Sequence, residues 1–144
     1  MKGYFMRILA IDYGMARTGV ALSDPTGLIA TPYRVVPSRN YEKLLIAIGE
    51  IISTIAPDKV ILGFPGRTDG TKSEMCERVE RFKDELKQRF NVDAELVDEK
   101  YTTVIASQML HAGGTKAKEQ RQNIDAAAAA VLLQGYLDGH RNEK

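Results

Sequence analysis

Acidic residues stand where apolar segments of this sequence begin or end. Asp12 follows the first apolar run of the chain, and Asp98 and Glu99 follow a later one. Asp125 opens an alanine-rich stretch in the last quarter of the sequence. An unpaired carboxylate beside a protein core costs free energy, and a divalent cation shared among several carboxylates would remove that cost. Because oxygen ligands suit Mg²⁺ or Mn²⁺, these residues predict a metal site with phosphoryl-transfer chemistry.

Each of these residues also has a plain structural interpretation. Asp12 could simply begin the turn that follows the first strand. Asp98 and Glu99 could form a charged strand exit, and only one of them need face a site, because neighbours on an extended chain point to opposite faces. An aspartate in a first helical turn, as we expect for Asp125, is favoured by the helix dipole alone.

The neighbours of Asp125 favour a functional role over a capping role. At helical spacing it shares a face with small and apolar residues: Ala128, Ala129, Leu132 and Tyr136. We expect this face to pack on a sheet, and alanines allow a close approach. The last helix would then bring Asp125 near Asp12.

Basic side chains lie in the same segments. Arg17 and Thr18 stand between two glycines, where a guanidinium, a hydroxyl and backbone amides could hold a phosphate oxygen. Arg67 lies in a glycine-rich loop that could equally be a plain connector. We expect Arg17, Thr18 and Arg67 to contact a phosphate.

Two clusters of lysine and arginine differ in their surroundings. Lys116, Lys118 and Arg121 directly precede Asp125, with a single glutamate among them, and are candidates to grip a nucleic-acid backbone. The basic residues of segment 78–89 alternate with acidic ones, so we expect a solvated helix face there.

The order of the elements predicts an α/β fold. Strand patterns cover residues 7–12, 18–23, 28–36, 60–63 and 94–97. Helical patterns cover residues 41–56 after an Asn40 N-cap, 72–90 opened by a capping box at Thr71 and Glu74, 102–112, and 124–137 after an Asn123 N-cap. Short turns make the first three strands an antiparallel meander, and helical crossovers make the last two parallel. The result is a five-stranded mixed sheet flanked by helices, with ligands at the carboxyl ends of its parallel strands.

Length and composition fit one domain, residues 1–144. The chain is 44% hydrophobic and 27% charged, with a net charge of +1. No apolar stretch approaches the roughly 20 residues that span a bilayer, so we expect no membrane association and no signal peptide. One cysteine and two histidines exclude a disulfide framework and argue against a structural zinc site, and they are consistent with a reducing cytosol.

Four short motifs in order make the chain resemble the YqgF/RuvX family of ribonuclease H-like nucleases. They are Ile11-Asp12-Tyr13-Gly14 with Arg17, Gly63-Phe64-Pro65, Asp98-Glu99, and Asp125-Ala126-Ala127-Ala128-Ala129. The resemblance implies the ribonuclease H-like fold, a cytoplasmic location and a metal-dependent nuclease in which Asp12, Glu99 and Asp125 are the catalytic, metal-binding acids. It departs from the family at Lys100, where arginine is usual, so a bidentate phosphate clamp is lost there although the charge is kept.

The resemblance also implies candidate substrates. The family is linked to 5′-end processing of precursor 16S ribosomal RNA, with ribosomal precursor particles as partners, and its members are often labelled Holliday junction resolvases. Resolution of a DNA junction needs two active sites, so a monomer would argue against it, and the sequence leaves monomer and homodimer open. Two other interpretations are an ATPase of the actin or sugar-kinase type, which would need a second such domain, and a nucleic-acid-binding module without activity.

Overall fold

Five strands form one mixed sheet in the computed structural model, which describes residues 7–64, 74–98 and 117–141. Of residues 117–125, 140 and 141 only the backbone is described. The strands are β1 (Ile8–Asp12), β2 (Arg17–Ser23), β3 (Ala30–Pro37), β4 (Lys59–Phe64) and β5 (Ala94–Asp98), in the order β3-β2-β1-β4-β5. The first three strands pair antiparallel, and β4 and β5 continue the sheet parallel to β1. The predicted meander with two parallel strands is confirmed.

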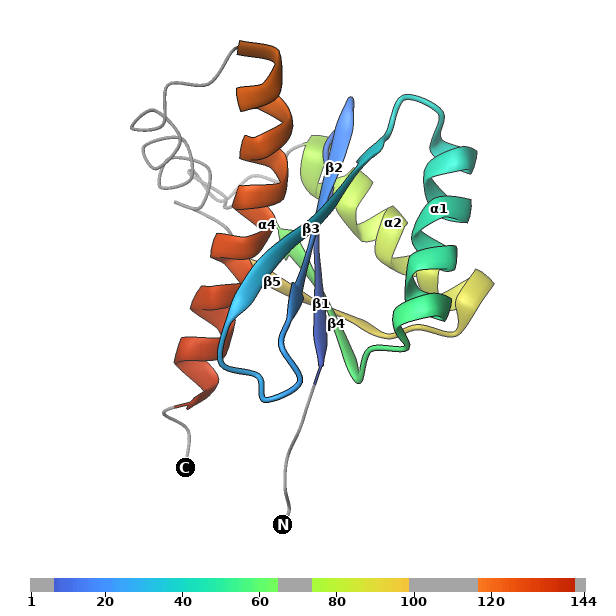
Figure 1. Cartoon of the computed structure of the whole chain (residues 1–144). Helices are drawn as coiled ribbons and strands as arrows, with labels where there is room; N and C mark the ends of the chain where they lie inside the picture. Colours follow the sequence, from blue (N-terminus) through green and yellow to red (C-terminus); the bar gives the residue numbers. More distant parts are fainter. Residues whose placement is uncertain (1–6, 65–73, 99–116, 142–144) are drawn as a thin grey trace.

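Helices cover both faces of this sheet, as Figure 1 shows. On one face lie α1 (Tyr41–Ile55) and α2 (Glu74–Phe90), and on the other lies α4 (Ala117–Arg141). β1 is buried on both sides because its side chains alternate between two cores: Leu9 and Ile11 pack with α1 and α2, and Ile8 and Ala10 pack with α4. Among the described residues, no helix is long and apolar enough to cross a membrane.

The first helix follows its sequence signals closely. The Asn40 side chain accepts a hydrogen bond from the Lys43 amide at 3.0 Å, which caps the helix as predicted. The chain leaves α1 at Ala56, whose φ of 51° is left-handed, and Pro57 follows. The predicted apolar face of α2 is buried from Cys76 to Leu86, whereas the Thr71 part of its capping box lies outside the described residues.

The last helix is longer than its sequence predicts. The Asn123 N-cap is wrong, because α4 begins at Ala117 and Asn123 lies inside it. The residues between them include lysine, glutamate, glutamine and arginine, which favour a helix by propensity without an apolar stripe to reveal it. Asp125 is therefore an interior helical residue rather than a first-turn residue. The predicted helix over 102–112 lies outside the described residues.

Candidate active site

Asp12 ends β1 on the sheet face that α4 covers. Side chains alternate along a strand, and Ile8 and Ala10 belong to the core beneath α4. Two residues beyond Ala10, the partly buried Asp12 therefore projects from the same face, at the carboxyl end of the parallel strands. This is the position that the sequence predicted for a ligand-binding carboxylate.

The early turns of α4 lie at this same end of the sheet. Ala126 lines a pocket together with Arg17, the first residue of β2. Two turns later, the Gln134 side chain accepts a hydrogen bond from the Ala30 amide and donates one to the Leu28 carbonyl, each at 2.9 Å, at the far end of the hairpin. α4 thus runs antiparallel to β1 and passes the carboxyl end of β1 near residue 126 (Figure 1).

Position 125 lies on the sheet-facing stripe of α4. Ala129, Leu132 and Tyr136 follow it at spacings of four, three and four residues, and all three are buried against the sheet. The structure therefore brings the backbone of Asp125 to the face and the end of the sheet from which Asp12 projects.

Asp98 lies on the other face. In β5, Val97 packs in the core beneath α4 and Leu96 packs in the core beneath α1 and α2. Asp98 pairs with Phe64 and follows Val97, so alternation directs its exposed side chain away from α4. It is not the acid that shares a face with Asp12.

A further acid, Glu95, lies on the α4 face but is committed to structure. Its carboxylate accepts a hydrogen bond from the Tyr136 hydroxyl at 3.0 Å and forms a salt bridge with Lys59 at 2.7 Å. The hydrogen bond to Glu95 is the main reason that the pKa of Lys59 is raised. Glu95 therefore ties β5 to β4 and α4.

The turn between β1 and β2 is shaped by Gly14. A Cβ atom at this position would lie 2.2 Å from the Arg17 carbonyl oxygen, so only glycine fits. The Gly14 amide donates to the Thr18 hydroxyl at 3.4 Å, and that hydroxyl shares a 2.6 Å hydrogen bond with Ser38. Thr18 is fully buried, so the prediction that it contacts a phosphate is wrong. Its hydroxyl anchors the turn instead.

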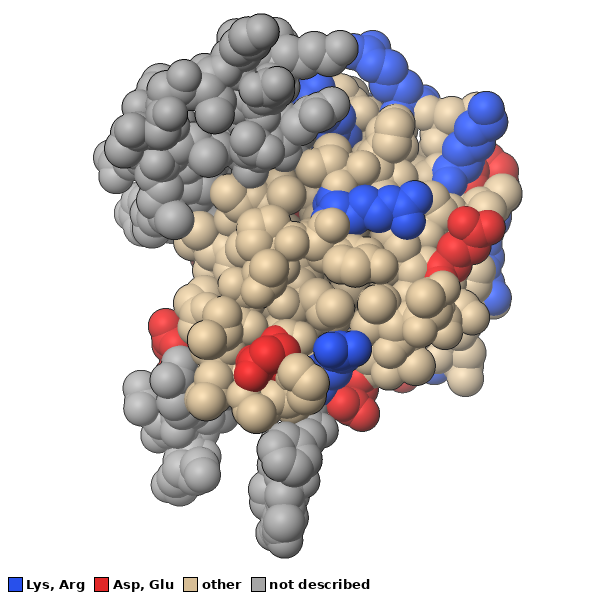
Figure 2. All heavy atoms as spheres, viewed as in Figure 1, with Lys and Arg blue, Asp and Glu red and all other residues tan. Residues whose placement is uncertain are grey.

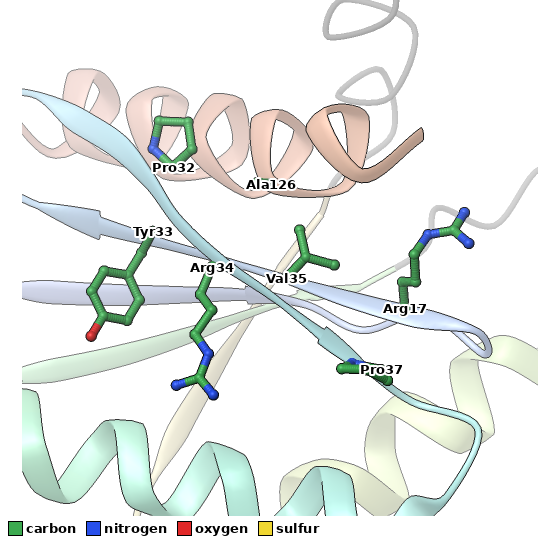
Figure 3. Close-up of a pocket in the computed structure, with 7 residues that line it drawn as sticks. All are labelled: Arg17, Pro32, Tyr33, Arg34, Val35, Pro37 and Ala126. Carbon is green, nitrogen blue, oxygen red and sulfur yellow. The ribbon is translucent and has the colours of Figure 1, made fainter. Parts of the chain in front are cut away.

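Arg17 lies where a phosphate could reach it. Its partly buried side chain lines a pocket of about 360 Å³ between Ala126 of α4 and the edge strand β3. Figure 3 shows the guanidinium directed away from the sheet on the α4 side. Arg17 and Asp12 thus belong to the same face.

The edge strand β3 carries a bulge that the sequence did not suggest. The β2–β3 register passes from Val20↔Arg34 to Ala21↔Pro32, which leaves Tyr33 as the extra residue of a bulge. Both Tyr33 and Arg34 are exposed, and both point away from α4 in Figure 3. The bulge is visible only in the strand pairing, because no pattern of residues in the sequence marks it.

The side chains of several predicted site residues lie outside the described part of the structure. Glu99, Lys100, Arg67 and Lys116 lie outside the described residues, and Lys118 and Arg121 are described only as backbone in the first turns of α4. Among described side chains, no group of three histidine, cysteine or acidic residues could hold a metal ion. The predicted ligands Asp12, Glu99 and Asp125 are all carboxylates, which suit a hard divalent cation. Asp12 is also held by a strand that is buried on both faces.

The sheet order and the placement of the helices define the ribonuclease H-like class, and solved structures agree. RuvC of T. thermophilus in complex with a Holliday junction substrate matches with a TM-score of 0.59 at 15% identity, covering 95% of this chain and 97% of that one. The resolvase of Fowlpox virus with Holliday junction DNA matches with a TM-score of 0.56 at 16% identity, covering 94% and 99%. At such identities the likeness establishes the fold.

Sequence relatives establish the family. The chain belongs to the RuvX family, described as Holliday junction resolvase, whose profile matches residues 6–139. A protein of Streptomyces coelicolor named "Putative pre-16S rRNA nuclease" is 40% identical over 136 residues, which are 94% of this chain and 81% of the relative. A protein of Burkholderia thailandensis with the same name is 40% identical over 132 residues, or 92% and 88%. The resemblance to a nuclease family is confirmed.

Proposed function

We propose that this protein is a divalent-metal-dependent nuclease that hydrolyses phosphodiester bonds in the 5′-end processing of precursor 16S ribosomal RNA. One observation carries the chemistry: Asp12 and backbone position 125 lie on the same face and at the same end of the sheet. The name shared by the relatives supports the choice of RNA. The protein would act in the cytoplasm on ribosomal precursor particles.

Three carboxylates would hold the metal. Asp12, Glu99 and Asp125 are the proposed ligands for Mg²⁺ or Mn²⁺, and the position of Asp98 on the opposite face favours Glu99 as the acid from that segment. When bound, such an ion lowers the pKa of an attacking water and stabilises charge on the leaving oxygen.

Basic residues around these acids would hold the substrate backbone. Arg17 lies on the Asp12 face and can offer a bidentate contact to a phosphate. The same role is proposed for Arg67, Lys100, Lys116, Lys118 and Arg121. Lys100 would attract a phosphate by its charge but could not make the bidentate contact that an arginine makes. Phosphate contacts position a strand without reading its sequence, so specificity would come from substrate shape.

Substitution of the first acid tests the chemistry. We expect Asp12→Asn to reduce metal-dependent cleavage of structured precursor RNA by about a hundredfold or more, since it removes charge at the reacting centre. Because Asp12 is partly exposed, thermal unfolding should change little. Full activity in Asp12→Asn would refute the assignment.

Cleavage of branched DNA is the second candidate. The description of the matching family as Holliday junction resolvase favours it. A side-by-side assay of precursor RNA and a four-way DNA junction separates the two candidates. Absence of metal-dependent cleavage on both substrates would leave a nucleic-acid-binding module without activity.

A further inference from the structure

A second pocket opens at the Asp12 end of the sheet, but on the opposite face. It has a volume of about 420 Å³, within the range of roughly 300–1,000 Å³ for ligand sites. Tyr13 places it on the α1 and α2 face, because its ring belongs to that core and stacks on Phe82 with centroids 5.2 Å apart. Three arginines and two tyrosines dominate its lining: Tyr13, Arg39, Tyr41, Arg78 and Arg81.

The three arginines of this pocket differ in their pairing. Arg78 pairs with Glu74 at 3.0 Å on the same helix. Arg39 and Arg81 are exposed and form no salt bridge within the described part of the chain, and Arg81 lies over the Tyr41 ring, 5.2 Å from its centroid. Figure 2 shows Lys and Arg side chains along the upper edge and upper right of the molecule, the end at which β3 leads into α1. Two arginines that form no salt bridge with a described residue favour an anionic ligand.

Tyr41, which lines this pocket, carries an unsatisfied hydroxyl. The Tyr41 hydroxyl is buried and has no hydrogen-bond partner within the described structure. Burial, followed by the charge of Glu85, raises the pKa of Tyr41, so its hydroxyl keeps its proton and remains a donor. An unpaired buried donor costs free energy, and a ligand oxygen would remove that cost. A lone hydroxyl beside guanidinium groups matches a phosphate, which accepts several hydrogen bonds.

We infer that the pocket formed by Arg39, Arg81 and Tyr41 binds a phosphate group of the nucleic-acid strand, on the sheet face opposite to Asp12. This inference rests on the proposed nuclease function only for the source of the phosphate. Asp12 and Tyr13 are consecutive residues at the end of β1, so a strand that crosses this end of the sheet can pass from one face to the other. The volume accommodates a nucleotide unit around the phosphate. The pocket would thus hold the strand beside the point of cleavage.

Binding measurements without metal test this inference separately from cleavage. The probe is fluorescein-labelled oligouridylate, titrated by anisotropy in EDTA over a series of salt concentrations with the full chain. We expect the double variant Arg39→Gln/Arg81→Gln to bind about tenfold more weakly. The slope of log Kd against log salt should fall by about one, because a phosphate contact is lost.

Lys87→Gln is the matched control. It removes one positive charge from the far end of α2, where Lys87 pairs with Asp93 at 3.3 Å, and it should bind as the wild type does. If the double variant behaves like Lys87→Gln, the pocket does not bind phosphate, whatever the outcome of the cleavage assays.

Tyr41→Phe separates a binding role from a structural role. Removal of an unsatisfied donor should leave the thermal unfolding midpoint unchanged or raise it, while binding of oligouridylate weakens by about threefold or more. A loss of stability without a loss of binding would overturn the inference.

Competition by uridine monophosphate and by inorganic phosphate identifies the source of the phosphate. If the phosphate belongs to the nucleic-acid backbone, neither competitor should displace oligouridylate when it is present at a concentration near the Kd of oligouridylate. Displacement by the monophosphate in the wild type but not in the double variant would support the phosphate site and assign it to a free nucleotide.

Discussion

Gly14 is the residue that a substitution would disturb most sharply at the β1–β2 turn. An added Cβ would lie 2.2 Å from the Arg17 carbonyl oxygen, and a backbone atom cannot swing aside as a side chain can. We expect Gly14→Ala to destabilise the protein by about 1–3 kcal/mol, measured by urea unfolding. It should also reduce cleavage, because the turn joins Asp12 to Arg17.

Gly135→Ala is the control for this prediction. An added Cβ at Gly135 meets nothing within 4 Å, and the residue lies inside α4. The same substitution should therefore stabilise the helix by roughly 0.5–1 kcal/mol. Equal effects of the two substitutions would contradict the steric argument for Gly14.

The sequence predicted where Asp12 lies along the chain better than it predicted the direction of each side chain. Asp12 ends the first strand, as predicted. Thr18 was expected to contact a phosphate, but strand alternation turns it into the core, where it bonds to Ser38. The direction of Tyr33 and Arg34 could not be predicted because it depends on a bulge between two strands.

The β2–β3 hairpin depends on the carboxylate of Asp24. This carboxylate accepts hydrogen bonds from the Leu28 and Ile29 amides at 2.8 and 2.9 Å and from the Thr26 hydroxyl. The bond from Thr26, followed by that from Ile29, lowers the pKa of Asp24 from 3.8 to about 2. A lowered pKa contributes stability that is present above 3.8 and is lost as the pH falls through 2.

Asp24→Asn should weaken the dependence of unfolding free energy on pH between about 4 and 2, since the ionised acceptor is gone. Urea unfolding across this range, with a carbon-detected NMR titration of the wild-type carboxyl, measures the effect. Asp93→Asn removes one exposed carboxylate elsewhere and is the control. An Asp24 carboxyl that titrates near 3.8 would contradict the role assigned to it.

Periodicity predicted the elements more reliably than their ends. The apolar stripe of α1 and its Asn40 cap were both confirmed, because the cap and the stripe indicate the same start of the helix. The start of α4 was misplaced because its first turns carry polar helix formers, which no apolar stripe marks. The stripe that follows Asp125 was confirmed, and this stripe places the helix on the sheet.

At the scale of the whole molecule, oligomeric state distinguishes the two candidate substrates. Symmetric cutting of a four-way junction requires two active sites, whereas processing of an RNA end requires one. We expect sedimentation velocity to give a monomer at concentrations that cleave precursor RNA. A stable dimer that cuts both strands of a junction symmetrically would favour the resolvase function instead.

The order of the elements was sufficient to predict the end of the sheet at which Asp12 lies. Three parallel strands place their carboxyl ends at one edge, so acids that follow them gather there. The pocket of Arg39, Arg81 and Tyr41 could not be predicted in this way. It joins the start of α1 to the middle of α2, and that pairing depends on tertiary packing around Phe82.

Diffraction from crystals soaked in Mn²⁺ would show directly whether the acids share a metal ion. We expect an anomalous peak about 2.0–2.2 Å from carboxylate oxygens of Asp12 and Asp125, with Glu99 rather than Asp98 beside it. The same soak of Asp12→Asn should lose the peak. A peak elsewhere, or Asp12 and Asp125 carboxylates directed apart with no density between them, would contradict the proposal of a metal-dependent nuclease.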